Sequence, residues 1–316
     1  MKFDLGNLNL RQLRYFLEVA ELHSFTRAAE TLHVAQSALS RQIRMLEDDL
    51  GVILFNRVDR GVTLTEPGER LRDRSAALLK DLHRLRHEVV GDAAGPQGDL
   101  AVGMPPSMRD MVTLPLMREY CRSFDKVTLH VHEGISVDLS RLVQEGQLDC
   151  AVIVDMMAVP QVSTGPLMRE RLYLIGPRGA GLSVRKAVSL DEVAARPLIL
   201  TTRPNSLRLV VENALAEAHL PPRIIADSNS TSAMVELAAD GMAYTVLPYC
   251  AAWKAIVDRR LSTAPIAGLA IDWVYIESLT RKKSRAATEF RHVLFEHCGR
   301  RIRRRQWRGA EMSSSS

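Results

Sequence analysis

The sequence lacks the features that would place the chain in a membrane or in an oxidising compartment. No segment runs for about 18 apolar residues, the length needed to cross a bilayer. The first ten residues show no charged segment followed by an apolar stretch and a small-residue cleavage site. The four cysteines, Cys121, Cys150, Cys250 and Cys298, lack the close spacing of zinc or redox sites. We therefore expect a cytoplasmic protein with reduced core thiols and no membrane contact.

The net positive charge of the chain comes from its C-terminal region. The net charge is +5, but residues 281–308 hold eleven Lys and Arg against two Glu, a local +9, so the rest of the chain carries −4. General basicity is therefore no evidence for nucleic-acid binding. Arg300 and the arginines after it have three alternative roles, which the sequence leaves open: to solvate a final helix, to contact a partner, or to contact phosphates nonspecifically. We expect residues 301–316 to form a basic, disordered tail.

The first 65 residues carry helical patterns instead. Apolar residues three and four apart predict a core helix over Leu10–Leu22. Ser24 is placed to cap a short helix over Thr26–Leu32, in which Ala28 and Ala29 are small enough to let another helix cross closely. The 316 residues, 46% of them hydrophobic, suit this small domain followed by a larger one.

A third predicted helix, Gln36–Glu47, has one apolar and one polar face. Leu39, Ile43 and Leu46 face inward, whereas amides, hydroxyls and guanidinium groups line the other side. A polar face alone is usually only solvated, but two helices, a short turn and this face together indicate a helix-turn-helix that reads the major groove of double-stranded DNA. The residues that we expect at the DNA are Thr26, Gln36, Ser37, Ser40, Arg41, Arg44, Arg57 and Arg60.

A predicted hairpin follows this helix and forms a wing. Gly51 ends the helix, and short strands over Leu54–Arg57 and Val62–Thr65 flank a tight turn. Arg57 and Arg60 suit a phosphate or the minor groove. For Arg57, a salt bridge that holds the wing is an equal alternative.

Seven segments of this module follow one family pattern. They are Phe16–Ala20, Ser24–Ala29, Ala35–Ile43, Leu46–Glu47, Leu50–Gly51, Leu54–Arg57 and Leu64–Gly68. The module resembles the signature of LysR-type transcriptional regulators. The resemblance implies a transcription factor, activator or repressor, and no enzyme. Ala35 stands where the family often has serine, so a side-chain cap on the recognition helix is absent or supplied otherwise.

Residues 66–91 are expected to form a dimerising linker helix. Pro67 suits its first turn, and an apolar heptad seam follows. The seam residues are Leu71, Leu78, Leu82, Leu85 and Val89, with Ser75 in the same register. The rest of the helix is mostly charged, so the seam predicts a homodimer; packing on the following domain is the alternative. The family resemblance further implies that two dimers join through their effector-binding domains into a tetramer.

After a hinge at residues 92–98, strands and helices alternate, which predicts an α/β fold with a parallel sheet. The expected strands are Leu100–Met104, Val127–His132, Cys150–Val154, Leu172–Ile175, Leu198–Leu200, Ile224–Ala226, Tyr244–Leu247 and Ile271–Glu277. The expected helices are Met108–Arg122, Val137–Glu145, Leu207–Ala218, Thr231–Asp240 and Arg285–Arg305. The resemblance implies a periplasmic-binding-protein-like effector domain over residues 99–300. Lobe I would take residues 99–160 and 269–300, and lobe II residues 161–268.

Effector candidates lie where the predicted strands end, because helix N-termini there present free N–H groups to anions. They are Pro106, Ser107, Gly134, Ser136, Thr201, Thr202, Arg203, Asn229 and Ser230. These groups suit a small carboxylate inducer, although each hydroxyl has an alternative role as a helix cap, and Arg203 as a surface pair. We expect that ligand binding shifts the lobes and so changes dimer spacing and DNA bending. RNA polymerase is a further candidate partner.

Two other functions fit less well. A glycine-rich turn at Gly176–Gly181 matches no nucleotide-binding motif, and His130 with His132 has no third metal ligand at a suitable spacing, so we expect no cofactor, no metal and no catalysis. A transport solute-binding protein would share the two lobes but not the DNA reader. The segment Arg196–Arg208 is similar to the subgroup of nitrogen-assimilation-control and aromatic-catabolism regulators.

Overall fold

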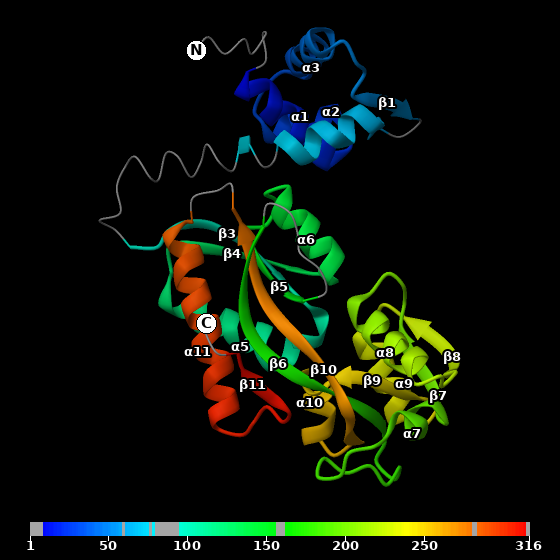
Figure 1. The fold of residues 1–316 in the computed structure, drawn as a ribbon. Helices are drawn as coiled ribbons and strands as arrows, with labels where there is room; N and C mark the ends of the chain where they lie inside the picture. Colours follow the sequence, from blue (N-terminus) through cyan, green and yellow to red (C-terminus); the bar gives the residue numbers. More distant parts are fainter. Residues whose placement is uncertain are drawn as a thin grey trace. The chain divides into compact units, whose positions relative to one another are not determined.

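The chain folds as two compact units, Met1–Asp92 and Ala93–Ser316 (Figure 1). A computed structural model describes residues 9–58, 61–75, 78–79, 95–155, 162–279 and 283–313. Among these residues, no helix combines the length and apolarity needed to cross a bilayer.

The N-terminal unit contains three helices, a hairpin and the start of a further helix. Its elements are α1 (Leu10–Leu22), α2 (Phe25–Thr31), α3 (Gln36–Leu50), β1 (Phe55–Val58) and β2 (Gly61–Leu64), and residues 66–75 and 78–79 are also helical. The caps explain these bounds: the Ser24 side chain accepts from the Arg27 backbone N–H, and Gly51 ends α3 in the left-handed region at φ 67°. The predicted helix-turn-helix and wing are confirmed.

The core of this unit lies between the three helices and the hairpin. Phe16, Leu39 and Leu54 are fully buried, and the rings of Phe16 and Phe55 lie 5.3 Å apart. Leu10, which we predicted in the buried stripe, is instead 48% exposed. It is the first residue of α1.

The second unit is built on a mixed sheet. Its strands are β3 (Gly98–Met104), β4 (Val127–Glu133), β5 (Cys150–Val154), β6 (Val162–Pro177), β7 (Pro197–Thr201), β8 (Arg223–Ser228), β9 (Tyr244–Pro248), β10 (Leu261–Ser278) and β11 (Ala310–Met312). The order is β4-β3-β5-β10-β6-β9-β7-β8, with β11 paired to β6. β3, β4 and β5 are mutually parallel, as are β7, β8 and β9, but β6 and β10 run antiparallel to their neighbours. The expected parallel sheet is thus right for two groups of strands and wrong for the long pair between them.

The long strands β6 and β10 connect two lobes (Figure 1). The second half of β10 pairs on one side with β5 and on the other with the first half of β6, up to Arg171. Both of these half-strands therefore belong to lobe I. β9 pairs with β6 only from Leu172 onward. The boundary of lobe II that we predicted at residue 161 therefore moves to about Leu172, because β6 continues straight from one lobe into the other.

Helices cover both lobes. In chain order they are α5 (Leu114–Ser123), α6 (Ser136–Gln144), α7 (Leu190–Ala194), α8 (Ser206–Glu217), α9 (Thr231–Ala239), α10 (Tyr249–Val257) and α11 (Arg285–Arg303), and α5 is preceded by a 3-10 turn, Pro106–Met108, and a π-helical turn, Arg109–Thr113. We did not predict α7 or α10. Cys150, Cys250 and Cys298 are buried as expected, whereas Cys121 on α5 is exposed and is no core thiol.

The C-terminal segment is ordered, so the prediction of a disordered tail over residues 301–316 is wrong for residues 301–313. α11 continues to Arg303, and β11 then pairs with β6. Trp307, between the two, is only 2% exposed, and its indole N–H donates to Glu170 at 2.7 Å. The arginines around Trp307 suggested a solvated tail, but this one aromatic side chain anchors it.

Candidate DNA interface and effector cleft

The polar face of α3 is the candidate DNA interface. Gln36, Ser37, Arg41 and Arg44 are exposed along it, whereas Ser40 is half-buried. The Gln36 amide donates to the Ser40 hydroxyl at 3.2 Å, so the two side chains are oriented together. No side chain caps α3 at Ala35, which leaves its first N–H groups available to an acceptor such as a phosphate.

The remaining predicted DNA contacts are only partly described. Thr26 is exposed in the first turn of α2. Arg57 lies in β1, but its side chain and the whole of Arg60 fall outside the described residues. Their roles at a phosphate or in the minor groove remain predictions.

Glu47 holds the wing to the recognition helix, a role that we did not predict. Its carboxylate accepts from the backbone N–H groups of Leu54, at 2.8 Å, and Phe55, at 3.4 Å. The Thr65 hydroxyl donates to the Ile53 carbonyl at 2.7 Å and accepts from Gly68 N–H. These bonds fix the spacing of α3, the wing and the linker helix.

The predicted dimer seam is described only at its start. Leu71 is half-buried against the core of its own unit, and Ser75 is buried, so these two side chains face inward. Leu78 is 45% exposed. Leu82, Leu85 and Val89 lie outside the described residues, so the seam remains a prediction.

A cavity of about 60 Å³ lies where the strand ends of both lobes meet. Six of the predicted effector residues line it: Pro106, Ser107, Gly134, Ser136, Thr201 and Asn229. Asn205, Leu247, Pro248, Ile271 and Trp273, which we did not predict, line it too. The volume is about twice the share of one water in the liquid, which is room for a group of carboxylate size.

Helix N-termini converge on this cavity. The first residues of α6 and α8 line it, and so do Thr231 at the start of α9 and Pro248 before α10. No side chain caps α6. The Thr201 side chain supplies a further polar group: Thr201 is 8% exposed, and its hydroxyl has no hydrogen-bond partner in the described part of the protein. This arrangement suits an anion.

Two other predicted hydroxyls, those of Ser136 and Ser230, already bond protein groups. The Ser136 hydroxyl accepts from Val154 N–H at 3.1 Å, and Ser230 caps α9 through Ala233 N–H at 3.3 Å. Thr202 and Arg203 do not line the cavity. Arg203 is a surface pair instead, because its guanidinium donates to Glu212 at 2.7 Å.

Arg208, also unpredicted, fixes the backbone of Thr201. It is 7% exposed and donates to the Thr201 carbonyl at 3.0 Å and to Glu212 at 2.6 Å. Burial alone would raise the pKa of Glu212, but hydrogen bonds from Arg208 and Arg203 hold it below its usual value. The buried guanidinium therefore holds Thr201 at the cavity wall.

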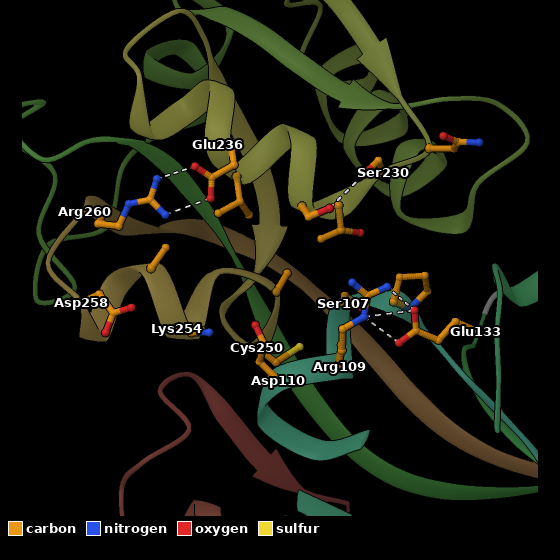
Figure 2. Close-up of a pocket in the computed structure, with 17 residues that line it drawn as sticks. Ser107, Arg109, Asp110, Glu133, Ser230, Glu236, Cys250, Lys254, Asp258 and Arg260 are labelled. Carbon is orange, nitrogen blue, oxygen red and sulfur yellow. Dashed lines mark hydrogen bonds and ion pairs between the residues drawn. The ribbon is translucent and has the colours of Figure 1, made fainter. Parts of the chain in front are cut away.

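A larger cavity of about 510 Å³ adjoins the first and shares Pro106, Ser107, Asn229 and Thr231 with it. Two ion pairs line it, Arg109 with Glu133 in lobe I and Arg260 with Glu236 in lobe II (Figure 2). Hydrogen bonds within the pairs raise the pKa of Arg109 and lower that of Glu236. The cavity forms a wide polar entrance to the small one.

Two family models match the chain. Residues 10–69 match the bacterial regulatory helix-turn-helix protein of the lysR family, and residues 93–299 match the LysR substrate binding domain. The chain belongs to the LysR family. LysR proteins are DNA-binding transcription regulators with an effector-binding domain and are not enzymes, so the resemblance inferred from the sequence is confirmed.

Individual LysR proteins extend this likeness along the chain. The nitrogen assimilation regulatory protein nac of Escherichia coli is 31% identical over 246 residues, which are 78% of this chain and 80% of that protein. The regulator BbuR of Bordetella bronchiseptica is 30% identical over 290 residues, 92% of this chain and 88% of that one. The crystal structure of full-length CbnR complexed with its target DNA has a TM-score of 0.69 at 23% identity and covers 93% of this chain and 99% of that one, which shows the shared fold.

The described residues of this LysR protein hold no group of three or more His, Cys, Asp or Glu side chains arranged for a metal ion. His130 instead lies 3.2 Å from Asp99 across β3 and β4.

Proposed function

We propose that this LysR protein recognises a specific DNA sequence through α3 and that a small carboxylate in the cleft between its lobes modulates that recognition. The cavity supports this proposal: it has room for a carboxylate, several helix N-termini meet at it, and Thr201 in its lining has a hydroxyl without a partner among the described residues. Binding there would favour one orientation of the lobes, because ligand contacts come from both. The resulting change in dimer spacing and DNA bending would reach transcription, with RNA polymerase a candidate partner.

We propose that the protein acts as a homodimer that pairs further into a tetramer. Twofold-related recognition helices would match half-sites one helical turn apart or multiples of it. Leu78 is exposed in the linker helix and would be covered in such a pair. Residues 36–60 hold four arginines and four acids, so a single DNA-binding domain has little net attraction to DNA and gains most from a second one.

DNase footprints with and without the inducer would test the effector mechanism; an unchanged protected length and bend would contradict it.

Replacing Arg41 with alanine is expected to weaken operator binding by at least about 1 kcal/mol, or roughly fivefold, because a contact to a base edge or phosphate is lost. Dimerisation should not change, since the side chain is exposed on α3. Arg14→Ala is the matched control: Arg14 is an exposed arginine on α1, so the same charge is removed elsewhere. Salt-matched titrations measure both, and equal loss in the two variants would show a general charge effect.

Replacing Thr201 with valine is expected to weaken acetate binding roughly fivefold without loss of stability. The change removes a hydroxyl that bonds no described protein group, on a residue that lines the cavity. Acetate is the probe because it is the smallest carboxylate with a methyl group, and acetamide has its shape without its charge. Thermal unfolding at constant ionic strength should show stabilisation of the wild type by acetate and not by acetamide.

Thr245 provides the matched control for this experiment. It is fully buried, its hydroxyl also has no partner among the described residues, and it does not line the cavity. Thr245→Val should therefore change stability as Thr201→Val does but leave acetate binding intact. Equal stabilisation of the wild type by acetate and acetamide would overturn the carboxylate proposal.

A further inference from the structure

Glu170, in the middle of β6, is completely buried and accepts from groups on three separate parts of the chain. Its Oε2 accepts from the Trp273 indole N–H at 2.7 Å, and its Oε1 accepts from the Trp307 indole N–H at 2.7 Å. Cys250 adds its backbone N–H at 3.0 Å and its thiol at 3.5 Å. All four groups on these three residues donate, which is the environment of a carboxylate acceptor.

Two of these donors belong to walls of the effector cleft. Trp273 lines the small cavity, and it is 2% exposed. Cys250 lines the wide entrance and follows closely after Pro248, which lines the small cavity. Glu170 therefore links the β10 wall and the start of α10 through one carboxyl group.

The third donor, Trp307, belongs to the C-terminal segment, defined here as residues 304–313. This segment is attached to β6 on both sides of Glu170: Arg171 N–H donates to the Gly309 carbonyl at 2.9 Å, and Ser313 N–H donates to the Leu167 carbonyl at 3.2 Å. β11 pairs Ala310 with Glu170 itself. The attachment lies where β6 passes from lobe I to lobe II, next to Leu172, from which β9 pairs.

We propose that the C-terminal segment is a working part of the effector site, in which Trp307 acts through Glu170 as a positioning residue for Trp273 and the start of α10. Without the Trp307 donor, Glu170 Oε1 keeps only the Cys250 backbone N–H, so the carboxyl group is held less firmly and positions the other two groups less precisely. The consequence for ligand affinity rests on the proposed function, whereas the positioning itself does not.

The positioning is tested without any ligand, in the full chain labelled with 5-fluorotryptophan. The chain has three tryptophans, so each Trp→Phe variant assigns one fluorine resonance. In Trp307→Phe, which keeps an aromatic ring but removes the N–H donor, the Trp273 resonance should shift by more than its width. Backbone hydrogen exchange of residues 247–250 and 271–277 should rise severalfold.

Trp253→Phe is the matched control. Trp253 is half-buried on α10, packs with Arg301 and makes no bond to Glu170. If Trp307→Phe moves the Trp273 resonance and the exchange rates no more than Trp253→Phe does, the proposal is overturned.

A second arm measures acetate. Trp307→Phe should weaken acetate stabilisation roughly fivefold in apparent affinity, and Trp253→Phe should not. Unchanged affinity in Trp307→Phe would remove the segment from the effector site even if the resonance shifts. If acetate fails to stabilise the wild type, the proposed function fails, and the ligand-free arm still decides the positioning.

A chain ending at Arg303 should show a larger shift of the Trp273 resonance and a larger loss of acetate affinity. A folded chain of that length with the wild-type Trp273 resonance would also contradict the proposal.

Discussion

Replacing Glu170 with alanine is expected to lower the free energy of unfolding of residues 93–316 by about 3 kcal/mol or more. The change leaves the two indole N–H groups and Cys250 N–H buried without an acceptor, and each such group costs about 1 to 3 kcal/mol. Burial raises the pKa of Glu170, so removing the carboxyl also relieves a desolvation cost. We expect the lost acceptors to outweigh that relief. Urea unfolding followed by tryptophan emission measures the difference.

Glu170→Gln separates the two contributions. The amide keeps one acceptor oxygen and the shape of the side chain but carries no charge. It should cost clearly less than alanine, because at least one donor keeps its partner. A loss below about 1 kcal/mol in Glu170→Ala would mean that waters replace the carboxylate easily and that this cluster contributes little to the fold.

Replacing Gly68 with alanine is expected to destabilise the N-terminal unit by about 2 to 3 kcal/mol and to abolish measurable operator binding. A Cβ at this position would lie 2.3 Å from the carbonyl oxygen of Leu54 and 3.0 Å from a Leu64 methyl. Since the obstacle is backbone, the linker helix must move away from the wing, which breaks the bond from Thr65 N–H to the Leu54 carbonyl. A unit of this size has a small free energy of unfolding, so a loss of this magnitude unfolds a large part of the molecules. Circular dichroism melts and operator titrations measure the two effects.

Gly51→Ala is the control for this variant. Gly51 has a left-handed backbone with φ 67°, but nothing lies within 4 Å of an added Cβ. Its cost should therefore be only the backbone term, about 1 kcal/mol. Equal losses at the two glycines would show that the close approach of the linker helix to the wing is not the cause.

The N-terminal unit could be predicted closely because its signals are local. Each helix carries its own apolar period, and Ser24 and Gly51 mark two helix ends within one turn of the residues that they cap. The role of Glu47 could not be read in the same way. The sequence shows no partner for it, because only the folded hairpin brings two backbone donors to its carboxylate.

In the second unit, the cavity residues that follow the carboxyl ends of strands could be predicted from the sequence. Pro106, Gly134 and Thr201 meet at one cavity because parallel strands present their carboxyl ends at one edge. Trp273 was missed because it lies within β10, at an irregularity in the pairing with β6, rather than in a loop. For Arg203 the sequence left a countercharge and a surface pair open, and in the structure it pairs with Glu212, one helix turn beyond Arg208.

The first half of β6 and the C-terminal segment could not be predicted, because their partners are far away in sequence. Val162–Arg171 mixes buried and exposed positions without a regular alternation, since it is covered differently by β10, β11 and the helices. Trp307 stands among arginines, and its partner Glu170 precedes it by 137 residues. Composition favoured solvent for the C-terminal segment, and its tertiary contacts outweighed that tendency.

The separation between Glu170 and Trp307 also has a consequence during translation. The N-terminal unit is complete in the nascent chain after residue 92, but lobe I must wait for α11 and β11 from the far end of the sequence. At about 5 to 20 residues per second, the ribosome needs roughly 7 to 27 s to pass from Glu170 to Trp307. For that time β6 lacks its partner β11, and the nascent chain carries a complete DNA-binding domain with an incomplete effector domain. Chaperone dependence should therefore concentrate in this interval, and messages truncated shortly before Trp307 should yield regulators that reach DNA but cannot complete their control domain.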